Sequence, residues 1–184
     1  MIGAKGISAL RLSLDPDVRH KTAFVLAHKL REAMGAEMKD RMLSGHVEID
    51  GAYFGGYVMP RNVKAERVDR RRSEHRSGKR RAVVIVRERK GRSPAFVFPR
   101  EDDAAPTIAA RATAGSTVYA DEDCCTNQAE SFFSRLRRME VGTHHHVSGP
   151  YLHSYATEAA WREDNRRKPN GALYEVVPEN RTGC

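Results

Sequence analysis

Two aspartates and an asparagine are the side chains in this sequence best suited to metal-dependent chemistry. Asp50 ends one strand candidate, in "HVEID", and Asp121 ends another, in "STVYAD". Asn127 and Glu130 open a helical segment that follows closely. Carboxylates at the ends of adjacent strands are what a divalent-metal site for phosphoryl transfer requires, and oxygen ligands suit Mg²⁺. Taken singly, however, an Asp after a strand is an ordinary turn former, and Asn127 with Glu130 fits a helix-capping box.

Hydrophobic periodicity predicts the elements that would position these residues. Alternating and continuous apolar runs predict four strands, and amphipathic stretches predict three helices beside them. The strands are expected near residues 46–59, 82–88, 94–98 and 116–120, and the helices at 103–112, 126–139 and 149–164. The segment "GTHHHVSG" between the last two helices is expected to be a loop.

The N-terminal part of the chain predicts a pair of helices. "ISALRLSL" is broken by Pro16, and a second helix follows that we expect to end at Gly35. Its apolar stripe at helical spacing comprises Ala23, Leu26, Ala27, Leu30, Ala33 and Met34. Two helices joined by a tight turn are typical of a DNA-binding helix-turn-helix, and equally of a plain scaffold hairpin.

The charge balance favours a polyanionic partner. Lys and Arg number 32 against 24 Asp and Glu, which gives a net charge of +8. Such an excess indicates nucleic acid, although a basic surface also serves solubility. The expected phosphate contacts are Arg19, Lys21, Lys29, Arg70, Arg71, Arg72, Arg80, Arg81, Arg135, Arg137 and Arg138.

The composition argues against a membrane protein or a secreted disulfide scaffold. No apolar run approaches the ~20 residues that cross a bilayer, and the N-terminus has no signal-peptide pattern. Cys124, Cys125 and Cys184 make neither a disulfide framework nor a zinc ribbon. We therefore expect a cytoplasmic protein.

Six ordered blocks together resemble the ISXO-like subgroup of bacterial insertion-sequence transposases. They are "KTAFVLAHKLREAM", "LSGHVEIDGAYFGG", "GSTVYADE", "CTNQAESFFSRLRR", "GTHHHVSGPYL" and "EAAWREDNRR". The resemblance implies an α+β (α/β) fold: an RNase H-like mixed sheet with flanking helices, preceded by a helix-turn-helix-like pair. It also implies a DDE-type site in which Asn replaces the third acid.

Carried onto this chain, the resemblance makes Asp50, Asp121 and Asn127 the catalytic residues and the ligands of Mg²⁺ or Mn²⁺. The implied reaction is cleavage of a phosphodiester at the element's end, followed by attack of the freed 3′-hydroxyl on target DNA. The implied partners are the terminal inverted repeats and target DNA, with a homo-oligomer possible, no membrane, and a location at the bacterial nucleoid. Gly51 stands where many relatives carry Glu.

The resemblance divides the chain into three expected segments. Residues 1–44 would be the helix-turn-helix-like DNA-binding segment, and residues 45–167 the RNase H-like catalytic domain with a deletion near 121–126. Residues 168–184 would be a flexible tail. The zinc ribbon that usually precedes the helix-turn-helix in such transposases is not recognisable in this sequence.

The spacing between Asp121 and Asn127 departs from the family pattern. They are six positions apart, since 127 − 121 = 6. The helix, strand and two connections that must lie between them need roughly 24 residues. The short spacing predicts an internal deletion that impairs or abolishes catalysis. The alternatives are a non-catalytic DNA-binding remnant, or a basic structural protein in which Asn127 only caps a helix and contributes about 1 kcal/mol.

Overall fold

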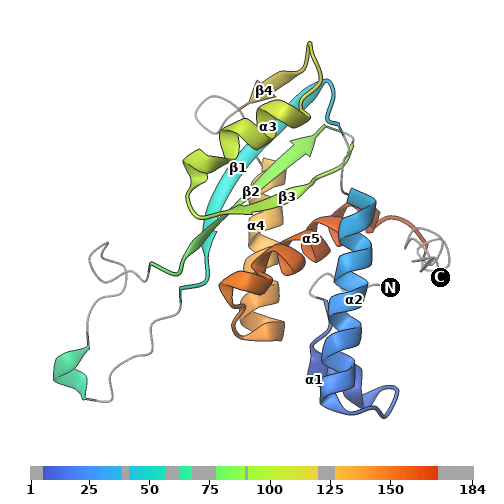
Figure 1. Cartoon of the computed structure of the whole chain (residues 1–184), viewed down its shortest axis with the longest axis vertical. Coiled ribbons are helices and arrows are strands. Elements are labelled where there is room, and N and C mark those ends of the chain that lie inside the picture. The colour runs from blue at the N-terminus through green and yellow to red at the C-terminus, as the bar shows by residue number, and fades with distance from the viewer. Residues whose placement is uncertain are drawn as a thin grey trace, which may run out of the picture.

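The computed structural model describes residues 6–38, 42–56, 63–67, 78–89, 91–119 and 127–169. Its helices and strands follow the sequence-based expectation closely (Figure 1). In chain order they are α1 (Ala9–Leu14), α2 (His20–Met38), β1 (His46–Phe54), η1 (Lys64–Glu66), β2 (Arg81–Glu88), β3 (Ala95–Phe98), η3 (Glu101–Ala104), α3 (Ala105–Arg111), β4 (Thr117–Tyr119), α4 (Asn127–Met139), the π-helical turn η4 (Glu140–His144) and α5 (Gly149–Asn165).

The four strands form one mixed sheet in the order β3-β2-β1-β4. β1 is antiparallel to β2, and β2 is antiparallel to β3, so the first three strands form a meander. β4 returns through α3 to lie parallel to β1. This confirms the expected α+β fold with flanking helices, and it is consistent with an incomplete RNase H-like fold.

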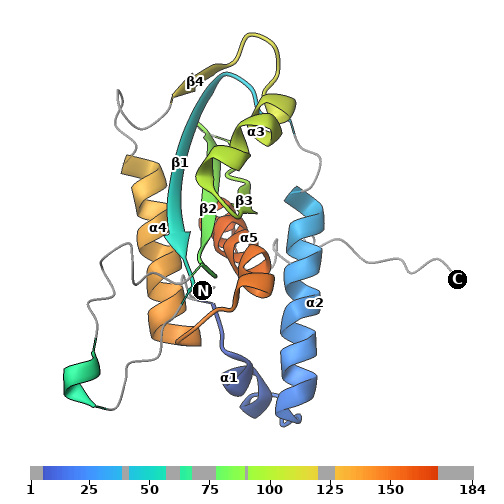
Figure 2. The same cartoon turned by 60° about the vertical axis from the view of Figure 1, so that its left-hand side comes forward.

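Helices cover both faces of the sheet (Figures 1 and 2). On one face, alternate residues of β1 and β2 pack against α2, α4 and α5 in the larger core. This core includes Met34, Met38, Ala52, Phe54, Val83, Ile85, Phe132, Phe133, Leu136 and Trp161. On the other face, the side chains that alternate with them pack against η3 and α3, around Val47, Val84 and Val86. Within the described residues no helix is long and apolar enough to span a bilayer.

α2 differs from the expectation in its length and in its buried face. It continues through Gly35 to Met38, because Met38 packs into the larger core. The cost of a helical glycine, about 1 kcal/mol, is smaller than the free energy gained by burying the Met38 side chain. Leu26 and Leu30 are 44% and 41% exposed, whereas Arg31 is buried. The predicted stripe was therefore wrong at the two leucines.

Two further differences concern the surroundings of the expected site. Asp50 does not end its strand, since β1 continues to Phe54 and pairs with β2 along that whole length. The loop predicted between α4 and α5 begins with the π-helical turn η4, which continues directly from α4. π-Helical turns inside helices commonly mark functional sites.

Candidate functional site

Asp50 lies in the middle of β1 on the face covered by α4. Alternate residues of a strand share a face, so Asp50 shares that of Ala52 and Phe54, both of which belong to the larger core. Phe54 stacks on Phe133 of α4 with a centroid separation of 6.1 Å. Asp50 is half-buried, and its Oδ1 accepts a 2.7 Å hydrogen bond from the backbone N–H of Gly51. The fold thus brings α4 onto the sheet face that carries Asp50.

Of the other two expected ligands, the structure describes only Asn127. Asp121 lies outside the described residues, and Asn127 is described only as the first residue of α4. β4 ends at Tyr119, which pairs with Glu48 of β1. In the described ranges no three His, Cys, Asp or Glu side chains gather into a group that could hold a metal.

Gly51 faces the opposite side of the sheet from Asp50. A Cβ at this position would collide with the carboxyl group of Glu101, which comes from η3. The absence of a side chain at residue 51 therefore leaves room for the Glu101 carboxylate.

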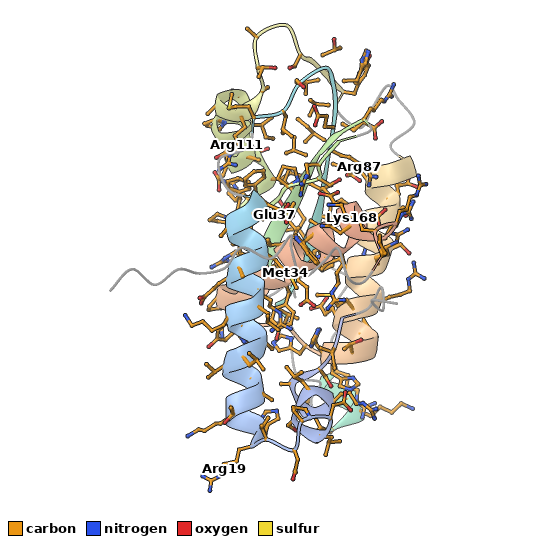
Figure 3. The ribbon with its side chains drawn as sticks, turned by 90° about the vertical axis from the view of Figure 1, so that its right-hand side faces the viewer. Arg19, Met34, Glu37, Arg87, Arg111 and Lys168 are labelled. Carbon is orange, nitrogen blue, oxygen red and sulfur yellow. The ribbon has the colours of Figure 1, made fainter. Side chains whose placement is uncertain are left out.

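A charged cluster around two buried carboxylates, Glu48 and Glu163, borders Asp50 on the same face of the sheet. Its members come from four elements of the fold: Glu48 of β1, Arg87 of β2, Arg135 of α4, and Glu163, Asp164 and Arg166 at the end of α5. The Glu163 carboxylate forms ion pairs with Arg135, with Arg87 at 3.9 Å and with Arg166 at 3.4 Å. Figure 3 shows Arg87 at the level of the first turns of α4. Sequence reasoning missed this cluster, although "WREDNRR" was a visible signal for it.

Burial dominates the electrostatics of the cluster. It lowers the pKa of Arg87, an effect opposed by the charges of Asp164 and Glu48. Burial also lowers the pKa of Arg135, and the neighbouring guanidinium groups act in the same direction. Burial raises the pKa of Asp164, against hydrogen bonds from Ser93. The shifts show that Arg87, Arg135 and Asp164 are partly withdrawn from solvent.

The basic residues expected to contact phosphates lie at two places on the fold, and several others lie apart from these. Arg19 and Lys21 are exposed at the far end of the α1–α2 pair, where Figure 3 shows Arg19 pointing away from the sheet. At the end of β1, the guanidinium of Arg80 lies 5.4 Å from the Tyr53 ring centroid. The guanidinium of Arg137 lies 5.8 Å from the Phe54 ring centroid.

The other residues expected to contact phosphates either have partners within the protein or lie outside the described residues. Lys29 pairs with Glu32 at 2.8 Å, and the Nε–H of Arg138 donates to the Ser134 carbonyl. Arg81 donates to the carbonyl of Arg80. Arg70, Arg71 and Arg72 lie outside the described residues.

A second buried ionic group joins α2 to α5. Glu158 accepts from the Nε–H groups of Arg31 and Arg162, at 2.7 Å and 2.8 Å. The guanidinium of Arg31 also lies 4.0 Å from the Tyr155 ring centroid. The ring of His144, from η4, packs edge-on against Tyr155 at 4.6 Å.

These surroundings predict that His144 makes the stability of the fold sensitive to acid. Burial lowers its pKa to about 4, and its buried Nε2 has no hydrogen-bond partner among the described residues. The unfolded chain binds the His144 proton below about pH 6.5, whereas the folded chain does so only near pH 4. Stability is therefore lost as the pH falls through that window.

We expect His144→Phe to flatten the loss of stability on acidification. Urea unfolding at pH 7.5 and at pH 5 measures it, with wild type and variant compared at each pH. The comparison is needed because burial raises the pKa of Glu140 and of Asp164, and this contributes with the opposite sign. An identical pH dependence in the two proteins would show that His144 is readily protonated in the fold.

Comparison with known protein families shows to which family the chain belongs. Residues 42–125 and 115–164 match the ISXO2-like transposase domain, and together these matches span about two thirds of the sequence. The chain belongs to the ISXO2-like transposase family. It is thus a transposase-family protein of an insertion sequence, with DNA as the partner that this membership implies. No curated protein and no solved structure matched the chain.

The two matched segments of this transposase meet at residues 115–125. That overlap includes Asp121 and ends two residues before Asn127. The family pattern is thus matched in two pieces, and the change from one to the other falls where β4 gives way to α4.

Proposed function

We propose that this chain is an insertion-sequence transposase whose divalent-metal site is formed by Asp50, Asp121 and Asn127. The register between β1 and β4 carries the proposal. His46, Val47 and Glu48 pair with residues 71 positions later, since 117 − 46 = 71. Asp50 and Asp121 have the same separation, since 121 − 50 = 71. A parallel strand continued by two residues in this register would bring the two carboxylates side by side.

The side chains fit a hard divalent cation. Asp50 supplies carboxylate oxygens, Asp121 would add more, and the amide oxygen of Asn127 suits the same Mg²⁺ or Mn²⁺. A bound cation supplies Lewis-acid activation of the attacking oxygen and stabilisation of the leaving one. The protein's part is to hold the DNA phosphate beside Asp50 and the start of α4.

We also propose that the short connection after β4 impairs catalysis. A strand and a helix beyond β4 would complete an RNase H-like sheet, and six positions do not contain them. The two-part family match, which changes segments at this place, supports an internal deletion. The favoured second function is therefore DNA binding without cutting.

The proposed DNA contacts lie at the free end of the α1–α2 pair and at the end of β1. Arg19 and Lys21 are exposed at the first place, and Arg137 is exposed at the second. With Arg80 at the end of β1 these residues make about four phosphate contacts, which predict a fall in affinity of roughly 100-fold between about 50 and 200 mM salt.

Fluorescence anisotropy with labelled duplex DNA tests the binding. We expect Arg19→Ala combined with Lys21→Ala to weaken binding and to reduce the salt slope by about 2. Lys168→Ala is the matched control, because Lys168 is also exposed but lies far from the free end of the helical pair (Figure 3). Binding that ignores salt, or an equal effect of the control, would contradict the proposed interface.

Cleavage and strand transfer are assayed with terminal inverted-repeat DNA and Mg²⁺. Any metal-dependent nicking is expected to be slow and to vanish in Asp50→Ala. Equal nicking by the wild type and Asp50→Ala would remove Asp50 from the mechanism. Salt-dependent binding with no nicking by either protein would support the non-catalytic function.

A further inference from the structure

The carboxylate of Glu163 pairs with three arginines of the charged cluster beside Asp50. Its side chain is only 4% exposed, yet it pairs with arginines from α4, β2 and the end of α5. Burying a carboxylate in this way is costly unless its partners are well placed. The pairs therefore hold three parts of the fold in one relative position.

One arm of the cluster leads to Asp50. Arg87 pairs in register with Glu48, and Glu48 is buried with its Oε1 accepting a 2.8 Å hydrogen bond from Arg89. Glu48 lies two residues before Asp50 on the same face of β1, roughly 7 Å along the strand. The cluster thus reaches the position next to the candidate metal ligand.

The other arm leads to the first turn of α4. Arg135 lies eight residues after Asn127, or about 12 Å along the helix axis. Apolar side chains of α4, among them Phe132, Phe133 and Leu136, also pack in the larger core against the sheet. Apolar burial is non-directional, whereas the ion pair between Arg135 and Glu163 joins one defined point of α4 to one defined point of α5. The Arg135–Glu163 pair therefore adds a specific contact that restricts where α4 can lie relative to α5.

We propose that Glu163 is a positioning residue of the metal site, which holds the start of α4 against Asp50 through Arg135 and Arg87. The proposal rests on the proposed function, because it needs a metal bound at Asp50. It assigns Arg135 a role inside the protein, in contrast to the exposed Arg137 on the same helix.

Mn²⁺ binding by the full chain tests this role, with free Mn²⁺ measured by electron paramagnetic resonance. Glu163→Gln keeps the size of the side chain and removes its charge, so we expect roughly 10-fold weaker binding, the effect typical of outer-shell partners. Glu158→Gln is the matched control. Glu158 is equally buried in α5 and also holds arginines, but these come from α2 and α5. The control should leave the Mn²⁺ affinity unchanged.

Arg135→Gln tests the same pair from the other side. We expect it to weaken Mn²⁺ binding as much as Glu163→Gln does, and the double variant to be no weaker than either single one. If Glu163→Gln does not fold by circular dichroism, Arg135→Gln decides the question. Wild-type affinity in the folded variant, or an equal loss in Glu158→Gln, overturns the positioning role.

Asp50→Asn separates this inference from the proposed function. If Asp50→Asn loses Mn²⁺ and Glu163→Gln does not, the metal site stands and only the positioning role fails. If Asp50→Asn binds Mn²⁺ like the wild type, the site itself is wrong and the inference falls with it.

Discussion

Replacing Arg31 with alanine is expected to lower the free energy of unfolding by about 3 kcal/mol. The pair between Arg31 and Glu158 is almost fully desolvated, with each side chain 4% exposed and an N–O distance of 2.7 Å. Among the described residues, removing the arginine leaves Arg162 as the remaining ion-pair partner of the buried Glu158 carboxylate, and it also removes the guanidinium from the Tyr155 ring. Urea unfolding followed by circular dichroism gives the free energy.

Lys29→Ala is the matched control for this prediction. Lys29 is on the same helix and pairs with Glu32 at a similar distance of 2.8 Å, but these side chains are 65% and 58% exposed. Exposed pairs contribute about 0–1 kcal/mol. If the two variants lose similar stability, the contact between α2 and α5 does not depend on the buried ion pair.

Trp161→Ala is expected to cost about 3–5 kcal/mol, because it leaves a large cavity in the main core. Trp161 is 2% exposed, and its Nε1–H donates to Glu37 Oε2 at 2.6 Å. Glu37 also accepts from Arg92, so the indole joins α5 to α2 and, through Arg92, to the β2–β3 connection. The variant therefore loses both apolar burial and a polar link between elements.

Trp161→Phe separates these two contributions. It keeps most of the apolar volume but loses the hydrogen bond to Glu37, for an expected cost of about 1–2 kcal/mol. Because Trp161 is the chain's only tryptophan, unfolding is followed by circular dichroism. Equal losses in the alanine and phenylalanine variants would mean that the hydrogen bond, and not the cavity, dominates.

Local patterns predicted the elements well and the long-range polar contacts poorly. The continuous apolar run "RAVVIVRE" predicted a strand at 82–88, and the strand is Arg81–Glu88. Arg31 had no local signal for burial, because its partner Glu158 lies 127 residues away. Gly35 looked like a helix stop, but the tertiary contacts of Met38 outweigh the glycine penalty.

The same distinction holds for the candidate site. The family resemblance singled out Asp50, and the sheet places α4 on its face. Neither periodicity nor resemblance predicted that Glu163, Arg87 and Arg135 would meet there, because they come from elements far apart in the chain. Their assembly depends on how α4 and α5 cross the sheet, which no local pattern specifies.

Mn²⁺ titration of the full chain tests the central claim, that Asp50 and Asp121 share a divalent cation. We expect Asp50→Asn and Asp121→Asn each to raise the dissociation constant at least about 10-fold. Asp102→Asn, at an exposed aspartate of η3, should leave it unchanged. Wild-type affinity in Asp50→Asn, or equal losses in all three variants, would contradict a metal site between β1 and β4.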